Sequence, residues 1–132
     1  MTMTNGYVKT AGKTHRTEYE SEIEDLLREI NGSPIVVEGI RDEKALLGFG
    51  FKNIHKIAGK PLDIVADNIS SKYDSVAILT DYDEEGEKAA RLLEKFFNHA
   101  GTKILTRFRR KFRSVFKVAT IEEALYAVNR PV

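Results

Sequence analysis

Acidic side chains follow two short apolar segments of this 132-residue sequence. Glu38 comes directly after Ile35–Val37, and Asp81 and Asp83 come directly after Ser75–Thr80. Two carboxylates about 4 Å apart repel each other by roughly 4 kcal/mol at an effective dielectric constant near 20, and a divalent cation removes that cost. Oxygen ligands without any cysteine or neighbouring histidine favour Mg²⁺, with Mn²⁺ as the alternative. An ion held there could polarise a phosphoryl group or orient a nucleophile.

A parallel sheet would bring these acids together. Apolar β-branched runs predict strands, and the amphipathic runs between them predict helices. Their alternation indicates an α/β fold of about four mainly parallel strands with helices on both faces. Ligands bind beyond the carboxyl ends of such strands, so neighbouring strands that end at Glu38 and at Asp81 would form one acidic rim. The expected strands are 35–37, 53–57, 75–80 and 103–106, and the expected helices are 17–30, 42–48, 61–69, 84–98, 107–117 and 120–128.

The acidic segments resemble the motifs of the Toprim domain family. Ile35–Gly39 matches the family's apolar strand ending in Glu-Gly, and Leu79–Gly86 matches its strand ending in Asp-x-Asp with a glycine soon after. Gly59 matches the glycine in the middle of the pattern, and the resemblance covers about residues 33–106. The family includes type IA and type II topoisomerases, bacterial-type primases and small ribosomal-RNA maturation nucleases. The resemblance therefore implies a Rossmann-like Toprim fold and metal-dependent chemistry on nucleic acid.

The resemblance also implies a role for each matched residue. Glu38 corresponds to the family's proposed general acid/base, and Asp81 and Asp83 correspond to its Mg²⁺-binding pair. Glu85 corresponds to the third acid that follows this pair in type IA topoisomerases. Gly39 is expected to let the backbone turn tightly beside the metal. The expected structural turn residues are together Gly39, Gly59 and Gly86.

The sequence departs from the large members of the family. None of its five tyrosines stands in a recognisable nucleophile context, and we expect no room for the additional domains of a topoisomerase or a primase. A stand-alone Mg²⁺-dependent nuclease or phosphotransferase acting on RNA or DNA is the favoured interpretation. The alternative is a non-catalytic module that binds nucleic acid or ribonucleoprotein as a subunit of a larger complex. A receiver-like phosphoacceptor domain is disfavoured, because receivers carry their acidic pair at the first strand rather than the third.

Charge is distributed unevenly along the chain, although its net charge is only +1. Residues 18–30 carry six acids and one base, whereas residues 103–117 carry seven bases and no acid. The apolar side chains of residues 107–117 fall on one helix face and the bases on the other. We expect the apolar face to pack on the sheet and the basic face to bind phosphate. A solvated face and a membrane-surface helix are the alternatives, and the acidic segment argues against the membrane. The candidate nucleic-acid ligands are Lys60, Arg107, Arg109, Arg110, Lys111 and Arg113.

The remaining expectations concern the ends of the chain and its surroundings. Residues 1–14 are polar and small, which predicts a flexible tail ahead of a single domain at residues 15–132. No apolar run is long enough to span a bilayer and no secretory signal is present, so we expect a cytoplasmic protein without a membrane partner. Residues 18–30 are the expected surface for a protein partner or a second copy of the chain, because an isolated sheet leaves edges to cover.

Overall fold

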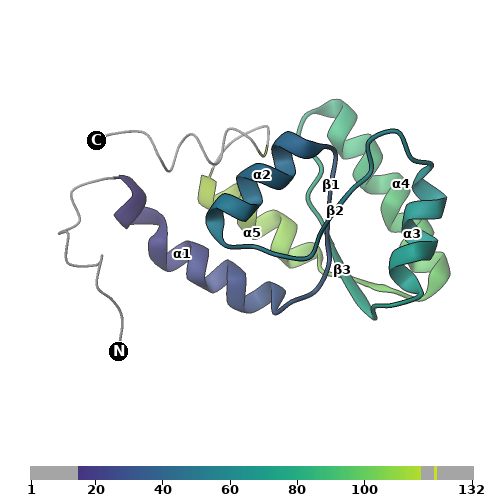
Figure 1. Ribbon diagram of the computed structural model, residues 1–132, viewed down its shortest axis with the longest axis horizontal. Helices are drawn as coiled ribbons and strands as arrows, with labels where there is room; N and C mark the ends of the chain where they lie inside the picture. Colours follow the sequence, from purple (N-terminus) through teal and green to yellow (C-terminus); the bar gives the residue numbers. More distant parts are fainter. Residues whose placement is uncertain (1–14, 117–120, 122–132) are drawn as a thin grey trace.

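The computed structural model describes residues 15–116 and residue 121, and Figure 1 shows how they are arranged. Helices and strands alternate along these residues, with boundaries within two residues of those expected. Their order is α1 (His15–Ile30), β1 (Ile35–Val37), α2 (Ile40–Phe49), β2 (Ile54–Lys56), α3 (Leu62–Ser70), β3 (Ser75–Ile78), α4 (Glu84–Ala100), β4 (Lys103–Ile104) and α5 (Thr106–Phe116). The expected tail at residues 1–14 and, apart from Ile121, the expected helix at residues 120–128 lie outside the described residues. Within the described part of the chain, no helix has the length and apolar content needed to cross a bilayer.

The four strands form one parallel sheet in the order β2-β1-β3-β4. In the register of the central strands, Val36 of β1 lies opposite His55 of β2 and Ile78 of β3. The chain therefore leaves β1 toward one edge of the sheet and returns to its other side at β3. Reversals of this kind open a crevice at the carboxyl ends of the strands. The strands that lead to Glu38 and to Asp81 are thus neighbours, which is the condition under which their acids form one rim.

Two apolar cores cover the two faces of the sheet. Side chains alternate along each strand, so Ile35 and Val37 face one core while Val36 faces the other. Helices α1, α2 and α5 cover the first face, and α3 and α4 cover the second (Figure 1). Burial on both faces explains why the central strands β1 and β3 are nearly continuous apolar runs rather than alternating ones.

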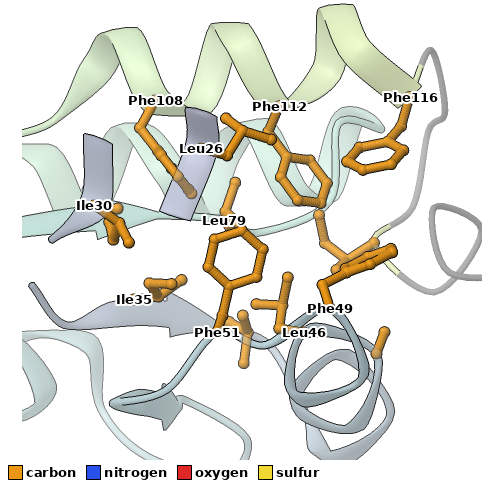
Figure 2. Packing of buried hydrophobic residues seen from close by; sticks show 14 of the residues in the cluster. Leu26, Ile30, Ile35, Leu46, Phe49, Phe51, Leu79, Phe108, Phe112 and Phe116 are labelled. Atoms are coloured by element: carbon orange, nitrogen blue, oxygen red, sulfur yellow. The ribbon is translucent and has the colours of Figure 1, made fainter. Parts of the chain in front are cut away.

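Aromatic side chains of α5 belong to the first core. Phe108, Phe112 and Phe116 are buried, and their rings lie against those of α2 and the segment that follows it (Figure 2). The ring centroids are 5.9 Å apart for Phe51 and Phe108 and 5.2 Å apart for Phe49 and Phe116. The prediction that the aromatic face of the basic segment packs on the sheet is confirmed.

The acidic helix α1 lies beside the basic helix α5. The Tyr19 ring stacks on Phe116 with centroids 5.4 Å apart, so the apolar side of α1 is covered within the chain. Glu29 Oε2 lies 3.8 Å from Arg107 Nε, and Glu29 Oε1 lies 3.5 Å from Lys111 Nζ. Part of the charge asymmetry is therefore balanced inside the molecule. Residues 18–30, where Glu22 and Glu24 are exposed, stay a predicted surface for a partner.

Candidate metal and nucleic-acid site

The acids of the two central strands meet at the carboxyl end of the sheet. Val36 of β1 is paired with Ile78 of β3. Glu38 lies two residues after Val36, and the β3–α4 loop that carries Asp81 and Asp83 follows Ile78. The Asp81 amide donates a hydrogen bond of 3.1 Å to Glu38 Oε2. This bond joins the two loops that carry the candidate catalytic and metal-binding acids.

Glu38 lies in surroundings that oppose its negative charge. Burial raises the pKa of the Glu38 carboxyl, and the carboxylates of Asp81, Asp42 and Asp83 raise it further. The hydrogen bond from the Asp81 amide acts in the opposite direction and lowers this pKa. The rim is therefore a place where a cation would relieve repulsion between carboxylates.

Asp81 is half-buried and is held from several directions. Its Oδ1 accepts a hydrogen bond of 3.0 Å from the backbone amide of Ile121, whose side chain is buried in the first core. Its backbone carbonyl accepts a hydrogen bond of 3.1 Å from Arg109 Nη2. Nothing in the local sequence around Asp81 predicts contacts with residues 28 and 40 positions away.

Asp83 caps helix α4. Its Oδ1 accepts a hydrogen bond of 2.8 Å from the Gly86 amide, one of the donors that a helix N-terminus leaves without a partner in the helix. The side chain is exposed, and in the described part of the chain its second carboxylate oxygen has no such bond. Glu85 is also exposed, in the first turn of α4. Asp83 thus caps α4 with one carboxylate oxygen while its side chain stays exposed.

Gly86 allows α4 to begin directly against the Asp81 backbone. A Cβ atom at this position would lie 2.0 Å from the Asp81 carbonyl oxygen, which no side chain tolerates. The Gly86 carbonyl in turn accepts a hydrogen bond of 2.7 Å from the buried hydroxyl of Thr80. A glycine is required here by close approach of two backbones.

The other two glycines of the motif differ from each other. Gly59 has φ of +72°, a left-handed conformation that favours glycine, and the turn is closed by a 2.8 Å hydrogen bond from the Lys60 amide to the Ile57 carbonyl. Gly39 precedes α2 with an extended φ of −153°, and a Cβ there would meet nothing within 4 Å. The expectation that Gly39 makes a tight, glycine-dependent turn is therefore wrong.

Arg109 lies inside the protein, whereas the sequence placed it among the candidate nucleic-acid ligands. Its guanidinium donates hydrogen bonds to the carbonyls of Ile78 at 3.2 Å, Thr80 at 2.7 Å and Asp81 at 3.1 Å. It also forms an ion pair of 3.2 Å with Glu87 in the first turn of α4. Arg109 on helix α5 thus fixes the end of β3 and the loop that carries the aspartates. Its donors are used within the fold, which removes it from the exposed basic surface.

The bonds of Arg109 to the end of β3 and to the aspartate loop form a buried clamp, and Tyr82, between the two aspartates, is part of it. Its hydroxyl donates a hydrogen bond of 2.9 Å to the Arg109 carbonyl, and the Arg109 guanidinium carbon lies 4.4 Å from the ring centroid. Burial raises the pKa of the Tyr82 hydroxyl well above its usual range. Tyr82 therefore stays protonated and acts as a structural donor.

The outer side of α5 carries the exposed cations. Arg107, Arg110 and Arg113 are exposed at intervals of three residues, which places them along one stripe. The Arg113 guanidinium carbon lies 5.3 Å from the Tyr82 ring centroid, so the stripe begins beside the aspartate loop. Lys111 lies beside the stripe and is engaged by Glu29.

Lys60 is exposed in the loop after β2, at the same end of the sheet as Glu38. The neighbouring Ala58 lines a pocket of about 480 Å³ together with Glu38 and Asp81. The sequence-predicted basic residues thus divide into exposed or partly exposed side chains and the buried Arg109. Among the former, Lys60 and Arg113 lie at the end of the sheet that carries the acids.

The acids present fit Mg²⁺, although the described residues contain no preformed group of three or more metal-binding side chains. Mg²⁺ keeps several water ligands and needs only one or two protein carboxylates plus substrate phosphate. Asp81 and Asp83 would supply those carboxylates, with Glu38 beside them. The all-oxygen donor set is the one that this ion prefers.

Comparisons with known proteins agree with this geometry. A family model described as Toprim domain matches residues 33–124. A UPF0292 protein of Pyrococcus horikoshii is 44% identical over 94 residues, which is 70% of each chain. A UPF0292 protein of Thermococcus gammatolerans is 35% identical over 114 residues, or 84% of each chain. Among solved structures, a putative protein from Aquifex aeolicus superposes with a TM-score of 0.69 at 32% identity, covering 78% of this chain and 95% of the other.

Proposed function

The chain belongs to the Toprim domain family, and from this premise we propose that it is a Mg²⁺-dependent enzyme that cleaves or transfers phosphodiester bonds in RNA or DNA. The family supports a nucleic-acid-related, metal-dependent role, and the similarity to small UPF0292 proteins is consistent with a stand-alone Toprim protein. The observation that carries the proposal is the bond between the Asp81 amide and the Glu38 carboxylate. It brings the acids of two neighbouring strands to one rim beside a pocket and a stripe of arginines.

Each group at the rim has a chemical task in this proposal. Bound Mg²⁺ would neutralise the aspartates and polarise a phosphoryl oxygen. Asp81 and Asp83 would hold the ion, and Glu38 would exchange a proton with the attacking or leaving oxygen. Arg110 and Arg113 would bind backbone phosphates on the outer side of α5. Arg109 would keep the aspartate loop in place without touching the substrate.

Cleavage of labelled RNA and DNA with and without Mg²⁺ tests the proposal. Glu38→Gln and Asp81→Asn should each lower the rate at least about a hundredfold, since each removes a charge that the reaction needs. Asp67→Asn, an exposed position on α3 outside the rim, should leave the rate unchanged. Metal-independent cleavage, or full activity in both rim variants, would contradict the proposal.

A non-catalytic nucleic-acid-binding module is the second candidate, and one observation favours it. The Asp83 carboxylate already caps α4 and the Asp81 carboxylate already accepts the Ile121 amide, so both aspartates have structural partners. A binding module would bind nucleic acid in a salt-sensitive way that depends on Arg110 and Arg113 but not on Mg²⁺. Salt-independent binding would exclude this candidate.

A further inference from the structure

The pocket beside the acidic rim has an apolar side as well as an acidic one. Its volume is about 480 Å³, within the range of about 300–1,000 Å³ typical of small-ligand sites. Glu38 and Asp81 of the rim line one side of it, while Ile40 and Ala58 line it with hydrocarbon. Arg41 adds one cation. A single pocket thus offers carboxylates for a metal, an apolar surface and a positive charge.

Ile40 is the unusual member of this lining. It is the first residue of α2, and this apolar side chain is 53% exposed. Leu47, on the same helix, is 52% exposed but does not line the pocket. Ile40 therefore presents apolar surface to whatever occupies the site, and Leu47 provides an internal comparison.

We propose that this pocket binds the sugar and base of one unpaired nucleotide whose phosphate lies at the acidic rim, an inference that rests on the proposed function. Ile40 and Ala58 pack against the sugar and the face of the base, and Arg41 pairs with an adjoining phosphate. A base in a duplex is stacked and paired, so it reaches such a pocket only after it is extruded, at a cost in free energy. An unpaired base enters without that cost.

The substrate class follows from this occupancy. The site acts on a phosphodiester bond next to an unpaired nucleotide, as found in single strands, loops, overhangs or frayed ends, rather than on a continuous duplex. The arginine stripe of α5 then holds the strand beyond the pocket.

Calorimetry of the full chain with Mg²⁺ tests the inference with three probes: ribose 5-phosphate, adenosine 5′-monophosphate and a short single-stranded oligonucleotide. The nucleotide should bind at least about fivefold more tightly than the sugar phosphate, because only the nucleotide buries a base against Ile40. Ile40→Ser should remove this difference, whereas Leu47→Ser should preserve it. The oligonucleotide should bind more tightly than the mononucleotide and more tightly than its own duplex.

The outcomes separate this inference from the proposed function. Equal affinity for the nucleotide and the sugar phosphate would overturn the base pocket while leaving the metal and phosphate site intact. A preference that survives Ile40→Ser would also overturn it. Equal affinity for the mononucleotide and the oligonucleotide would indicate that the pocket binds a free nucleotide rather than a nucleic-acid strand, and would contradict the inference. Absence of all binding, by probes and by Mg²⁺ alone, would overturn the inference and the proposed function together.

Discussion

Glu38 lies where the fold disfavours the charged form of its carboxyl group. Burial and three neighbouring carboxylates raise its pKa, so a negative charge on Glu38 lowers the stability of the metal-free protein. Glu38→Gln removes the charge while its side-chain oxygen can still accept the Asp81 amide. We expect the variant to melt about 2 °C higher than wild type in the absence of divalent metal. Differential scanning calorimetry measures this, and a lower melting temperature than wild type would contradict the account of the rim.

Arg109 combines several bonds that no other residue of α5 makes. Arg109→Met would leave three carbonyls and Glu87 without their buried donor, and we expect it to lower the free energy of unfolding by about 3 kcal/mol. Arg110→Met, at the exposed neighbouring position, should change it by less than about 0.5 kcal/mol. Urea denaturation of the two variants provides the comparison. Equal effects would contradict the buried clamp.

Arg109→Lys tests whether Arg109 positions the Asp81 loop in addition to stabilising the fold. Lysine keeps the positive charge but not the planar donor array that reaches the three carbonyls and Glu87 at once. We expect a folded protein whose dissociation constant for Mg²⁺ rises about fivefold, because the Asp81 loop is held less firmly. Arg110→Met serves again as the control. Unchanged Mg²⁺ affinity in a folded Arg109→Lys protein would limit Arg109 to a structural role.

The acidic residues could be identified as candidate site residues from the sequence, whereas the buried role of Arg109 could not be predicted. Glu38, Asp81 and Asp83 stand in a recognisable order at the ends of strands. Arg109 stands in a run of bases where nothing local distinguishes it from its exposed neighbours. Its burial depends on which side of α5 meets the β3–α4 loop, and that contact joins residues 22 to 31 positions apart.

At the scale of elements, the start of α4 depends on a glycine and the start of α2 does not. We expect Gly86→Ala to destabilise the protein by at least about 3 kcal/mol, because the new methyl group would collide with the Asp81 carbonyl. Gly39→Ala should change stability by less than about 1 kcal/mol, since that position is extended and open. Thermal unfolding of both variants decides the matter. A tolerated alanine at position 86 would contradict the described packing.

The identity and order of the elements could be predicted, because the central strands are short apolar runs and the segments between the strands have the pattern of helices. The order of strands in the sheet could not, since periodicity does not say which strands pair. Adjacency of β1 and β3, on which the rim depends, was therefore only a condition until the sheet order was known. The Ile121 contact with Asp81 joins segments too distant for any local signal.

At the scale of the whole molecule, Glu29 moderates the basic surface. Glu29→Gln would release Arg107 and Lys111 from their acidic neighbour. We expect little loss of stability, because ion pairs at the protein surface contribute less than about 1 kcal/mol. We expect affinity for single-stranded nucleic acid to rise about twofold at low salt, with a steeper dependence on salt concentration. Glu24→Gln changes the net charge equally at an exposed position of α1 without such partners in the described part of the chain. Identical behaviour of the two variants would show that only net charge matters.

Asp81 and Asp83 are the proposed metal ligands at the carboxyl ends of the sheet. Calorimetric titration with Mg²⁺ compares wild type with Asp81→Asn/Asp83→Asn and with the control Asp67→Asn. We expect saturable Mg²⁺ binding by wild type and by the control, and loss of that binding in the double variant. Binding by the double variant with wild-type affinity would contradict the claim and place the metal elsewhere.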